Sequence, residues 1–154
     1  MADAMSPQEF ATQRLVLVCV DAPERQAVIK AALEQLGFTM HAAKTVEDAV
    51  ERLRRETFEI AIIDESFQGG SALDNEVLKA LDSMPMSTRR YVFVALLGRT
   101  YKTFDNMLAF ARSVNVVVNL NDLPHLPAIL RKGVTENNEF YRVFREMLAE
   151  VGKR

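Results

Sequence analysis

The chain has 154 residues, of which 49% are apolar and 26% are charged, and its formal net charge at pH 7 is −2. This size and composition fit one domain with its own hydrophobic core. The balanced charge argues against a nucleic acid or an anionic membrane as partner. The single cysteine, Cys19, cannot form an internal disulfide, no signal peptide is visible, and no apolar run approaches the roughly 18 residues of a membrane helix. We therefore expect a cytoplasmic protein.

The first third of the chain predicts strands that alternate with helices. Residues 1–13 have little periodicity, and we expect a flexible lead-in without chemistry. The continuous apolar run Leu15–Val20 predicts a buried strand, and Pro23 suits the first turn of the helix that follows. Gly37 is placed to end that helix. A short strand over 38–42 and a helix over 46–55, capped by Thr45, complete this part.

The stretch 58–64 organises the rest of the chain. It is apolar and rich in β-branched residues, which is typical of a strand buried on both faces of a parallel sheet. The run ends at Asp64, so this carboxylate is predicted at the carboxyl end of a strand, where open α/β sheets bind their ligands. A polar loop containing Gly69 and Gly70 follows.

Further alternation of helices and strands indicates the fold class. We expect a helix over 73–81, a strand over 91–97, a helix over 102–114, a strand over 116–118, and a fifth covering helix with Leu123, Leu126, Ile129 and Leu130 facing inward. Five βα units connected by right-handed crossovers require a parallel sheet that is covered on both faces. The prediction is a three-layer, doubly wound α/β domain with a five-stranded parallel sheet.

The C-terminal part exceeds what such a fold requires. Gly133 is expected to interrupt the helical pattern, and Thr135 could cap an additional helix. This extension, residues 133–154, carries an apolar stripe that includes Phe140, Tyr141 and Phe144. The stripe could pack back on its own domain, or it could form an interface with a second copy or another protein.

The order of these elements, with Val18–Pro23 after the first strand and Ile62–Asp64 after the third, resembles the receiver domain of two-component response regulators. The resemblance covers residues 14–130 and implies a receiver-like domain over 14–132 with flavodoxin-like strand order 2-1-3-4-5. It also implies that Asp64 is at the phosphoacceptor position and that Asp21 is one of the magnesium-binding acids. Magnesium and a lysine would neutralise the charge of the transferred phosphoryl group.

Four positions depart from the pattern of that family. Val20 replaces the other magnesium-binding acid, and Leu97 or Gly98 occupies the position of the Ser or Thr. Val116 replaces the aromatic residue of strand five, and Asn119 replaces the lysine. Asn119 can donate hydrogen bonds but carries no charge. The departures favour a degenerate receiver, a pseudo-receiver that acts through protein–protein interaction without catalysis of its own. The alternative is a working phosphorelay receiver, with phosphate on Asp64 and Mg²⁺ bound through Asp21.

The expected interaction surface consists of the fourth helix, the fifth strand, the fifth helix and the C-terminal extension. Its partner is another signalling protein or a second copy of the chain. Asp21 and Asp64 form at most a weak magnesium site, and no other cofactor is expected. His41 and His125 have no spacing that suggests zinc, and Cys19 is expected to be a core residue. A flavin-type cofactor rests on fold analogy alone.

Overall fold

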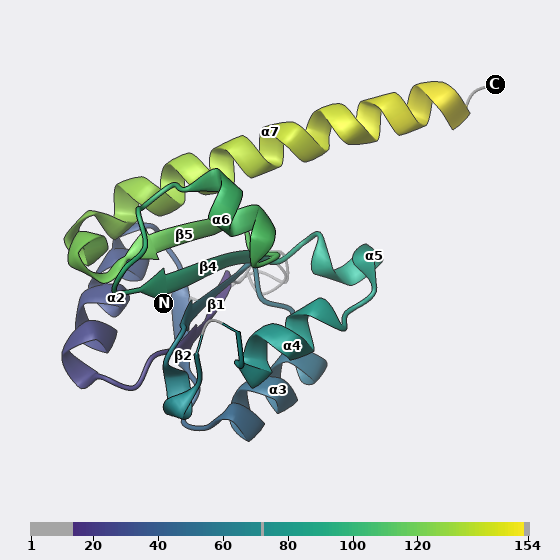
Figure 1. The fold of residues 1–154 in the computed structure, drawn as a ribbon. Coiled ribbons are helices and arrows are strands. Elements are labelled where there is room, and N and C mark those ends of the chain that lie inside the picture. The colour runs from purple at the N-terminus through teal and green to yellow at the C-terminus, as the bar shows by residue number, and fades with distance from the viewer. Residues whose placement is uncertain (1–13, 72, 153–154) are drawn as a thin grey trace, which may run out of the picture.

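Five parallel strands form one sheet in the computed structural model, which describes residues 14–71 and 73–152 (Figure 1). Their order in the sheet is β2-β1-β3-β4-β5, as predicted. The strands are β1 (Leu15–Cys19), β2 (Thr39–Ala42), β3 (Ile60–Asp64), β4 (Phe93–Gly98) and β5 (Val116–Asn119). The expected lead-in, residues 1–13, lies outside the described residues.

Strand β3 is the centre of the sheet. It pairs with β1 on one side and with β4 on the other, and all five of its residues are buried. In this register Ile62 lies between Val18 and Ala95. The continuous apolar pattern of β3 follows from this position, because neither face of the strand meets water.

Helices cover both faces of the sheet (Figure 1). One face packs against α2 (Pro23–Gln35) and the first part of α7 (Leu126–Gly152), and the other against α3 (Val46–Arg55), α4 (Glu76–Asp82) and α6 (Asn106–Ala111). Two 3-10 helices, η1 (Phe67–Gly69) and η2 (Leu120–His125), and the short helix α5 (Met86–Arg89) occupy the connections. The three-layer architecture is therefore confirmed.

The predicted ends of α2 and α3 are confirmed by their local geometry. Pro23 is the first residue of α2, and Gly37 follows the helix with a φ of 83°, a conformation that costs glycine little. The hydroxyl oxygen of Thr45 accepts a hydrogen bond from the backbone N–H of Asp48, which caps α3.

Helix α6 is shorter than the predicted helix over 102–114. It begins at Asn106, after Asp105, whose carboxylate accepts a hydrogen bond from the backbone N–H of Leu108. The preceding residue, Phe104, has a φ of 68°, and its backbone N–H donates to the carbonyl of Val117 at 3.1 Å. The hydrophobic periodicity of this segment was misleading, because its first residues hydrogen-bond to β5 instead of forming a helical turn. Helix α4 also begins later than predicted, after its cap Asn75.

Helix α7 corrects the prediction of two separate helices. It runs without interruption from Leu126 to Gly152, so Thr135 is not a helix cap, and the expected boundary between residues 132 and 133 lies inside one helix. Gly133 serves packing: a Cβ atom there would lie 2.7 Å from Cζ of Phe93. The glycine allows α7 to pass closely over β4, and the helical turns of α7 continue on both sides of this residue.

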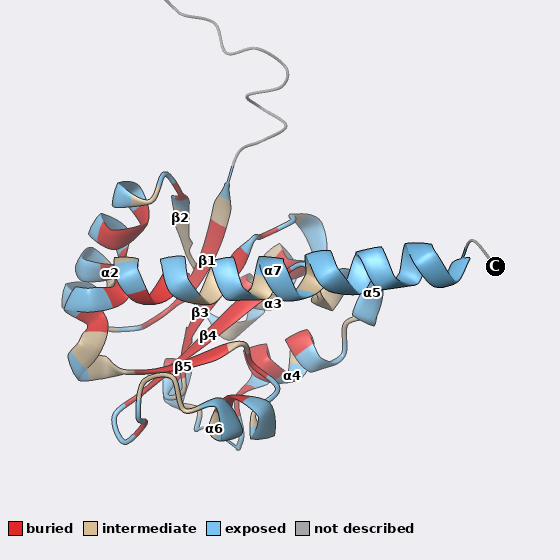
Figure 2. Ribbon diagram, turned by 90° about the horizontal axis from the view of Figure 1, so that it is seen from above, coloured by how far each residue is buried: buried red, intermediate tan, exposed pale blue. Residues whose placement is uncertain are grey.

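The second half of α7 extends beyond the sheet, and most of its residues are exposed (Figure 2). The helix runs antiparallel to the strands, so it passes the ends at which the strands begin. Although α7 has 27 residues, no helix in the described part of the chain is apolar enough over a sufficient length to cross a membrane.

Candidate functional site

Asp64 is the last residue of β3, and its side chain is buried, with 3% of the residue exposed. Its Oδ1 accepts hydrogen bonds from the backbone N–H of Ser66 at 2.9 Å and from the Ser66 hydroxyl at 2.8 Å. Its Oδ2 lies 3.5 Å from Nη1 of Arg25. The buried carboxylate thus has a counter-ion within the chain, which such a group requires.

Arg25 reaches Asp64 because of the strand order. It lies in the first turn of α2, which leaves the carboxyl end of β1, and β1 is the neighbour of β3. This cation was not predicted from the sequence, because the receiver pattern places its positive charge after strand five, where this chain has Asn119. One feature could have indicated it: a positive side chain in the first turn of a helix opposes the helix dipole, so a nearby anion is expected to compensate.

Asp21 is held by Gln68 from the loop after β3. Oδ2 of Asp21 accepts a hydrogen bond from the backbone N–H of Gln68 at 2.9 Å, and Oδ1 accepts one from its side-chain amide at 2.8 Å. Gln68 has a φ of 53°, which is uncommon for a residue with a side chain. The burial of its neighbour Phe67, 2% exposed, fixes the loop in this conformation. Both oxygens of Asp21 therefore have protein donors.

Glu65 links the loops that follow β3 and β4. Its carboxylate accepts hydrogen bonds from the Tyr101 hydroxyl at 3.2 Å and from the backbone N–H of Arg99 at 3.3 Å. A Cβ atom at Gly98 would lie 2.5 Å from the Tyr101 ring, so glycine is needed for this contact. Burial, and secondarily the charge of Glu65, raise the pKa of Tyr101 to about 12.

Asn119 holds the same loop from β5. Its side-chain amide donates to the carbonyl oxygens of Arg99 at 3.2 Å and Tyr101 at 2.6 Å. Its Oδ1 accepts from the backbone N–H of Asn121 at 2.8 Å. The residue at the lysine position of the receiver pattern thus binds backbone groups of the chain, and these contacts occupy both of its functional groups.

The three other departures from the receiver pattern are core residues. Val20, Leu97 and Val116 are at most 4% exposed and belong to the same hydrophobic cluster, on the face covered by α2 and α7. Val20 and Leu97 are apolar where the receiver pattern has polar side chains, and Val116 is aliphatic where the pattern has an aromatic ring. Cys19 is also buried, and burial raises the pKa of its thiol to about 12, so it behaves as a small core residue, as expected.

The acidic residues do not form a complete metal site. No group of three or more His, Cys, Asp or Glu side chains within residues 14–71 and 73–152 is arranged to hold a metal ion. The guanidinium group of Arg25 beside Asp64 also opposes the entry of a second cation. Magnesium binding through Asp21 and Asp64 would thus compete with the contacts that these residues make with Gln68 and Arg25.

The three interaction residues expected on the C-terminal extension lie on the second half of α7. Phe140 is 65% exposed and Phe144 is 39% exposed, whereas Tyr141 is half-buried. The Tyr141 ring makes edge contacts with both phenylalanine rings, at centroid distances of 5.3 and 6.4 Å. Two of the three aromatic side chains therefore present surface to solvent.

Comparisons with known proteins agree with this architecture. No family model and no curated protein sequence matches the chain. Among solved structures, a response regulator from Thermotoga maritima matches with a TM-score of 0.60 and 22% identity, covering 80% of this chain and 98% of its own. The receiver domain of the sensor histidine kinase PA1611 from Pseudomonas aeruginosa PAO1, with magnesium in its active-site cleft, matches with a TM-score of 0.57 and 17% identity, covering 78% and 97%.

The chain has the receiver fold. A third similar structure is a fusion that carries the trimeric coiled coil of yeast Spc42; it matches with a TM-score of 0.61 and 18% identity and covers 93% of this chain and 98% of its own. In this fold, Asp21 lies after β1, Asp64 ends β3 and Glu65 comes directly after it, at the crevice where the strand order reverses.

Proposed function

We propose that this chain is a receiver-like signalling module that acts by protein–protein interaction, without phosphorylation of Asp64 as its working input and without catalysis of its own. The exposed apolar surface of α7 carries the proposal. The exposed apolar residues on the second half of this helix form what we call the α7 stripe: Phe140, Val143, Phe144, Met147, Leu148 and Val151.

The contacts of the acidic residues support the second part of the proposal. Phosphorylation would add a charge of about −1.5 to −2 at Asp64. Asp64 is 3% exposed and already pairs with Arg25, and Asp21 already accepts two hydrogen bonds from Gln68. Magnesium and a phosphoryl donor could reach these oxygens only after those contacts break. The amide of Asn119 supplies no compensating charge.

The spacing of the α7 stripe favours a second copy of the chain as the partner. Phe140, Phe144, Met147 and Val151 follow one another at intervals of four, three and four residues, which is the a/d pattern of helices that pair with each other. Arg142 forms ion pairs with Glu139 and Glu146 along the same helix, which leaves a formal charge of only −1 on these three side chains. Because they are exposed, the repulsion between them in two adjacent helices is small.

Sedimentation equilibrium of the purified chain tests this proposal. The wild type should form a dimer, and the double variant Phe140→Asp, Met147→Asp should be monomeric, because it places charges in the apolar seam. Both positions are more than 60% exposed, so the monomer should remain folded. Leu73→Asp is the matched control: Leu73 is 80% exposed but lies in the connection between β3 and α4, and its replacement should leave the dimer intact.

A monomeric wild type would contradict self-association and would favour another signalling protein as the occupant of the stripe. That result is separate from the question of phosphorylation. Incubation with acetyl phosphate and Mg²⁺, followed by intact mass measurement, should give no phosphorylated species. A phosphorylated wild type together with an unmodified Asp64→Asn variant would establish the alternative, a phosphorelay receiver with Mg²⁺ bound through Asp21.

A further inference from the structure

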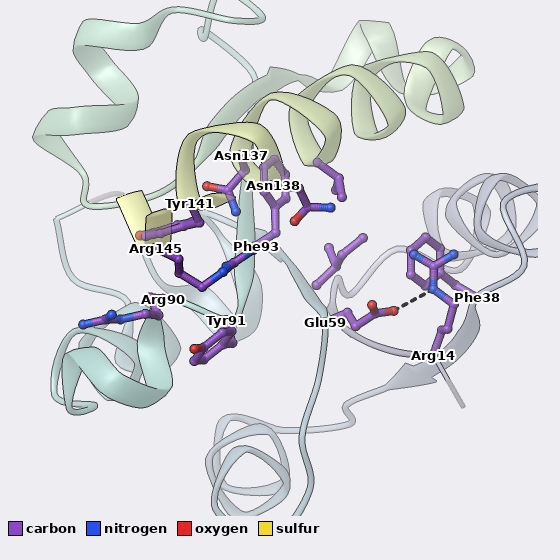
Figure 3. Close-up of a pocket in the computed structure, with 12 residues that line it drawn as sticks. Arg14, Phe38, Glu59, Arg90, Tyr91, Phe93, Asn137, Asn138, Tyr141 and Arg145 are labelled. Atoms are coloured by element: carbon purple, nitrogen blue, oxygen red, sulfur yellow. Dashed lines mark hydrogen bonds and ion pairs between the residues drawn. The ribbon is translucent and has the colours of Figure 1, made fainter. Parts of the chain in front are cut away.

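A cavity of about 100 Å³ lies at the end of the sheet opposite Asp64 (Figure 3). Its floor consists of residues at the beginnings of strands, including Arg14, Glu59 and Phe93, and its roof is the middle of α7. The cavity exists because α7 continues past the sheet edge, so that Tyr141 and Arg145 lie over residues that would otherwise face solvent. It shares no residue with the acidic site.

The lining of the cavity has an excess of positive charge. Three arginines, Arg14, Arg90 and Arg145, and one carboxylate, Glu59, leave a formal charge of +2. Arg14 pairs with Glu59, its Nε lying 2.8 Å from the carboxylate, and Figure 3 shows this pair on the side of the cavity away from Arg90 and Arg145. Glu59 therefore neutralises Arg14, and Arg90 and Arg145 supply the net positive charge of the cavity lining.

Arg90 and Arg145 have no acidic partner among residues 14–71 and 73–152. Arg90 donates from Nε to the carbonyl oxygen of Met86 at 3.0 Å, and its guanidinium lies 5.9 Å from the centroid of the Phe144 ring. These contacts orient Arg90 but leave its terminal nitrogens available. Within the described part of the chain, Arg145 makes no hydrogen bond or ion pair. A guanidinium pair of this kind suits the oxygens of a phosphate group.

Aromatic and amide side chains accompany the two arginines. Tyr91, which is 62% exposed, and the half-buried Tyr141 line the cavity, together with the amide groups of Asn137 and Asn138. A second cavity of about 300 Å³ adjoins the first and shares Arg14, Phe38 and Asn138 with it. The first cavity has room for a phosphate group, and the second has room for a ring system attached to it.

We propose that this cavity binds a phosphate monoester attached to a planar ring system, as in a nucleoside monophosphate. Arg90 and Arg145 bind the phosphate, whose charge of about −1.5 to −2 matches the +2 of the lining. The ring system lies in the adjoining cavity, where Leu36, Phe38 and Asn138 contact it. The site shares no residue with the surroundings of Asp64, and Phe144, beside Arg90, is its contact with the α7 stripe. Its test measures ligand binding and does not depend on the function proposed above.

Isothermal titration calorimetry with adenosine monophosphate, inorganic phosphate and adenosine tests the proposal. Adenosine monophosphate should bind more tightly than either of the other two probes. Arg145→Ala should weaken its binding roughly tenfold to a hundredfold, the expected effect of losing hydrogen bonds between charged groups. Arg142→Ala is the matched control, because it removes the same charge from the same helix at a position outside the cavity.

Three results would overturn the proposal. The first is the absence of binding by adenosine monophosphate, and the second is equal binding by the Arg145→Ala and Arg142→Ala variants. The third is binding of adenosine as tight as that of adenosine monophosphate, because the phosphate would then contribute nothing. Circular dichroism of each variant confirms that the fold is intact, and Arg90→Ala provides an independent second variant in the same cavity.

Discussion

Nη1 of Arg25 lies 3.5 Å from Oδ2 of Asp64, so the first turn of α2 is joined by an ion pair to the carboxyl end of β3. The carboxylate is almost completely buried, whereas the arginine side chain retains 32% of its exposure. Removing Arg25 alone therefore leaves the buried charge of Asp64 without a counter-ion, whereas removing both charges leaves no unpaired charge. The difference between these two changes in stability measures the strength of the ion pair.

Arg25→Met should lower the free energy of unfolding by about 2 kcal/mol, and the double variant Arg25→Met, Asp64→Asn should recover part of that loss. Urea denaturation of the wild type, both single variants and the double variant gives the coupling energy. Arg54→Ala, an exposed arginine on α3, is the control and should change stability little. A coupling energy of zero would show that the two side chains do not interact in solution.

Gly133→Ala should destabilise the protein by about 1–2 kcal/mol, although alanine is the better helix former. The added methyl group would lie 2.7 Å from the ring of Phe93, which is only 4% exposed and cannot move aside. Gly152→Ala is a matched control in the same helix, because nothing lies within 4 Å of a Cβ atom there. Thermal unfolding of both variants tests this prediction. Equal changes in melting temperature would show that Gly133 does not pack closely against Phe93.

We expect the ionisation of Tyr101 to lower the stability of the protein at alkaline pH. The pKa of Tyr101 is raised from 10.0 to about 12, so the fold favours the neutral phenol. This contribution is complete below about pH 10 and disappears as the pH rises through about 12. In Tyr101→Phe the loss over that interval should be smaller by about 1–2 kcal/mol, while Cys19, with a pKa also raised to about 12, still contributes. The same decrease in wild type and variant would refute the assignment to Tyr101.

Asn119→Ala should release the loop that follows β4. The variant loses the two amide donors to the carbonyl oxygens of Arg99 and Tyr101, at a cost of about 1–2 kcal/mol. Hydrogen exchange followed by mass spectrometry should be faster over residues 99–105 and unchanged in β1. Asn121→Ala serves as the comparison, since Asn121 contributes only its backbone N–H to Asn119. Unchanged exchange over 99–105 would mean that other contacts hold the loop.

Local patterns in the sequence were sufficient for the strands, their parallel arrangement and the ends of α2 and α3. These features depend on periodicity, on Pro23 and Gly37, and on the cap at Thr45, all of which act between residues close together in the chain. The positions of Asp21 and Asp64 at strand ends were also predicted, because a buried apolar run that stops at an acid defines the end of a strand.

Contacts between distant residues were decided only by the tertiary structure. Gly133 lies inside a continuous α7, where it packs closely against Phe93, and the hydrogen bond between residues 104 and 117 shortens α6. The pairing of Arg25 with Asp64 depends on β1 and β3 being neighbours, and the cavity beneath α7 depends on the length of that helix. Sequence periodicity reports which residues avoid water, but it does not report which partner each side chain meets; three-dimensional packing determines that.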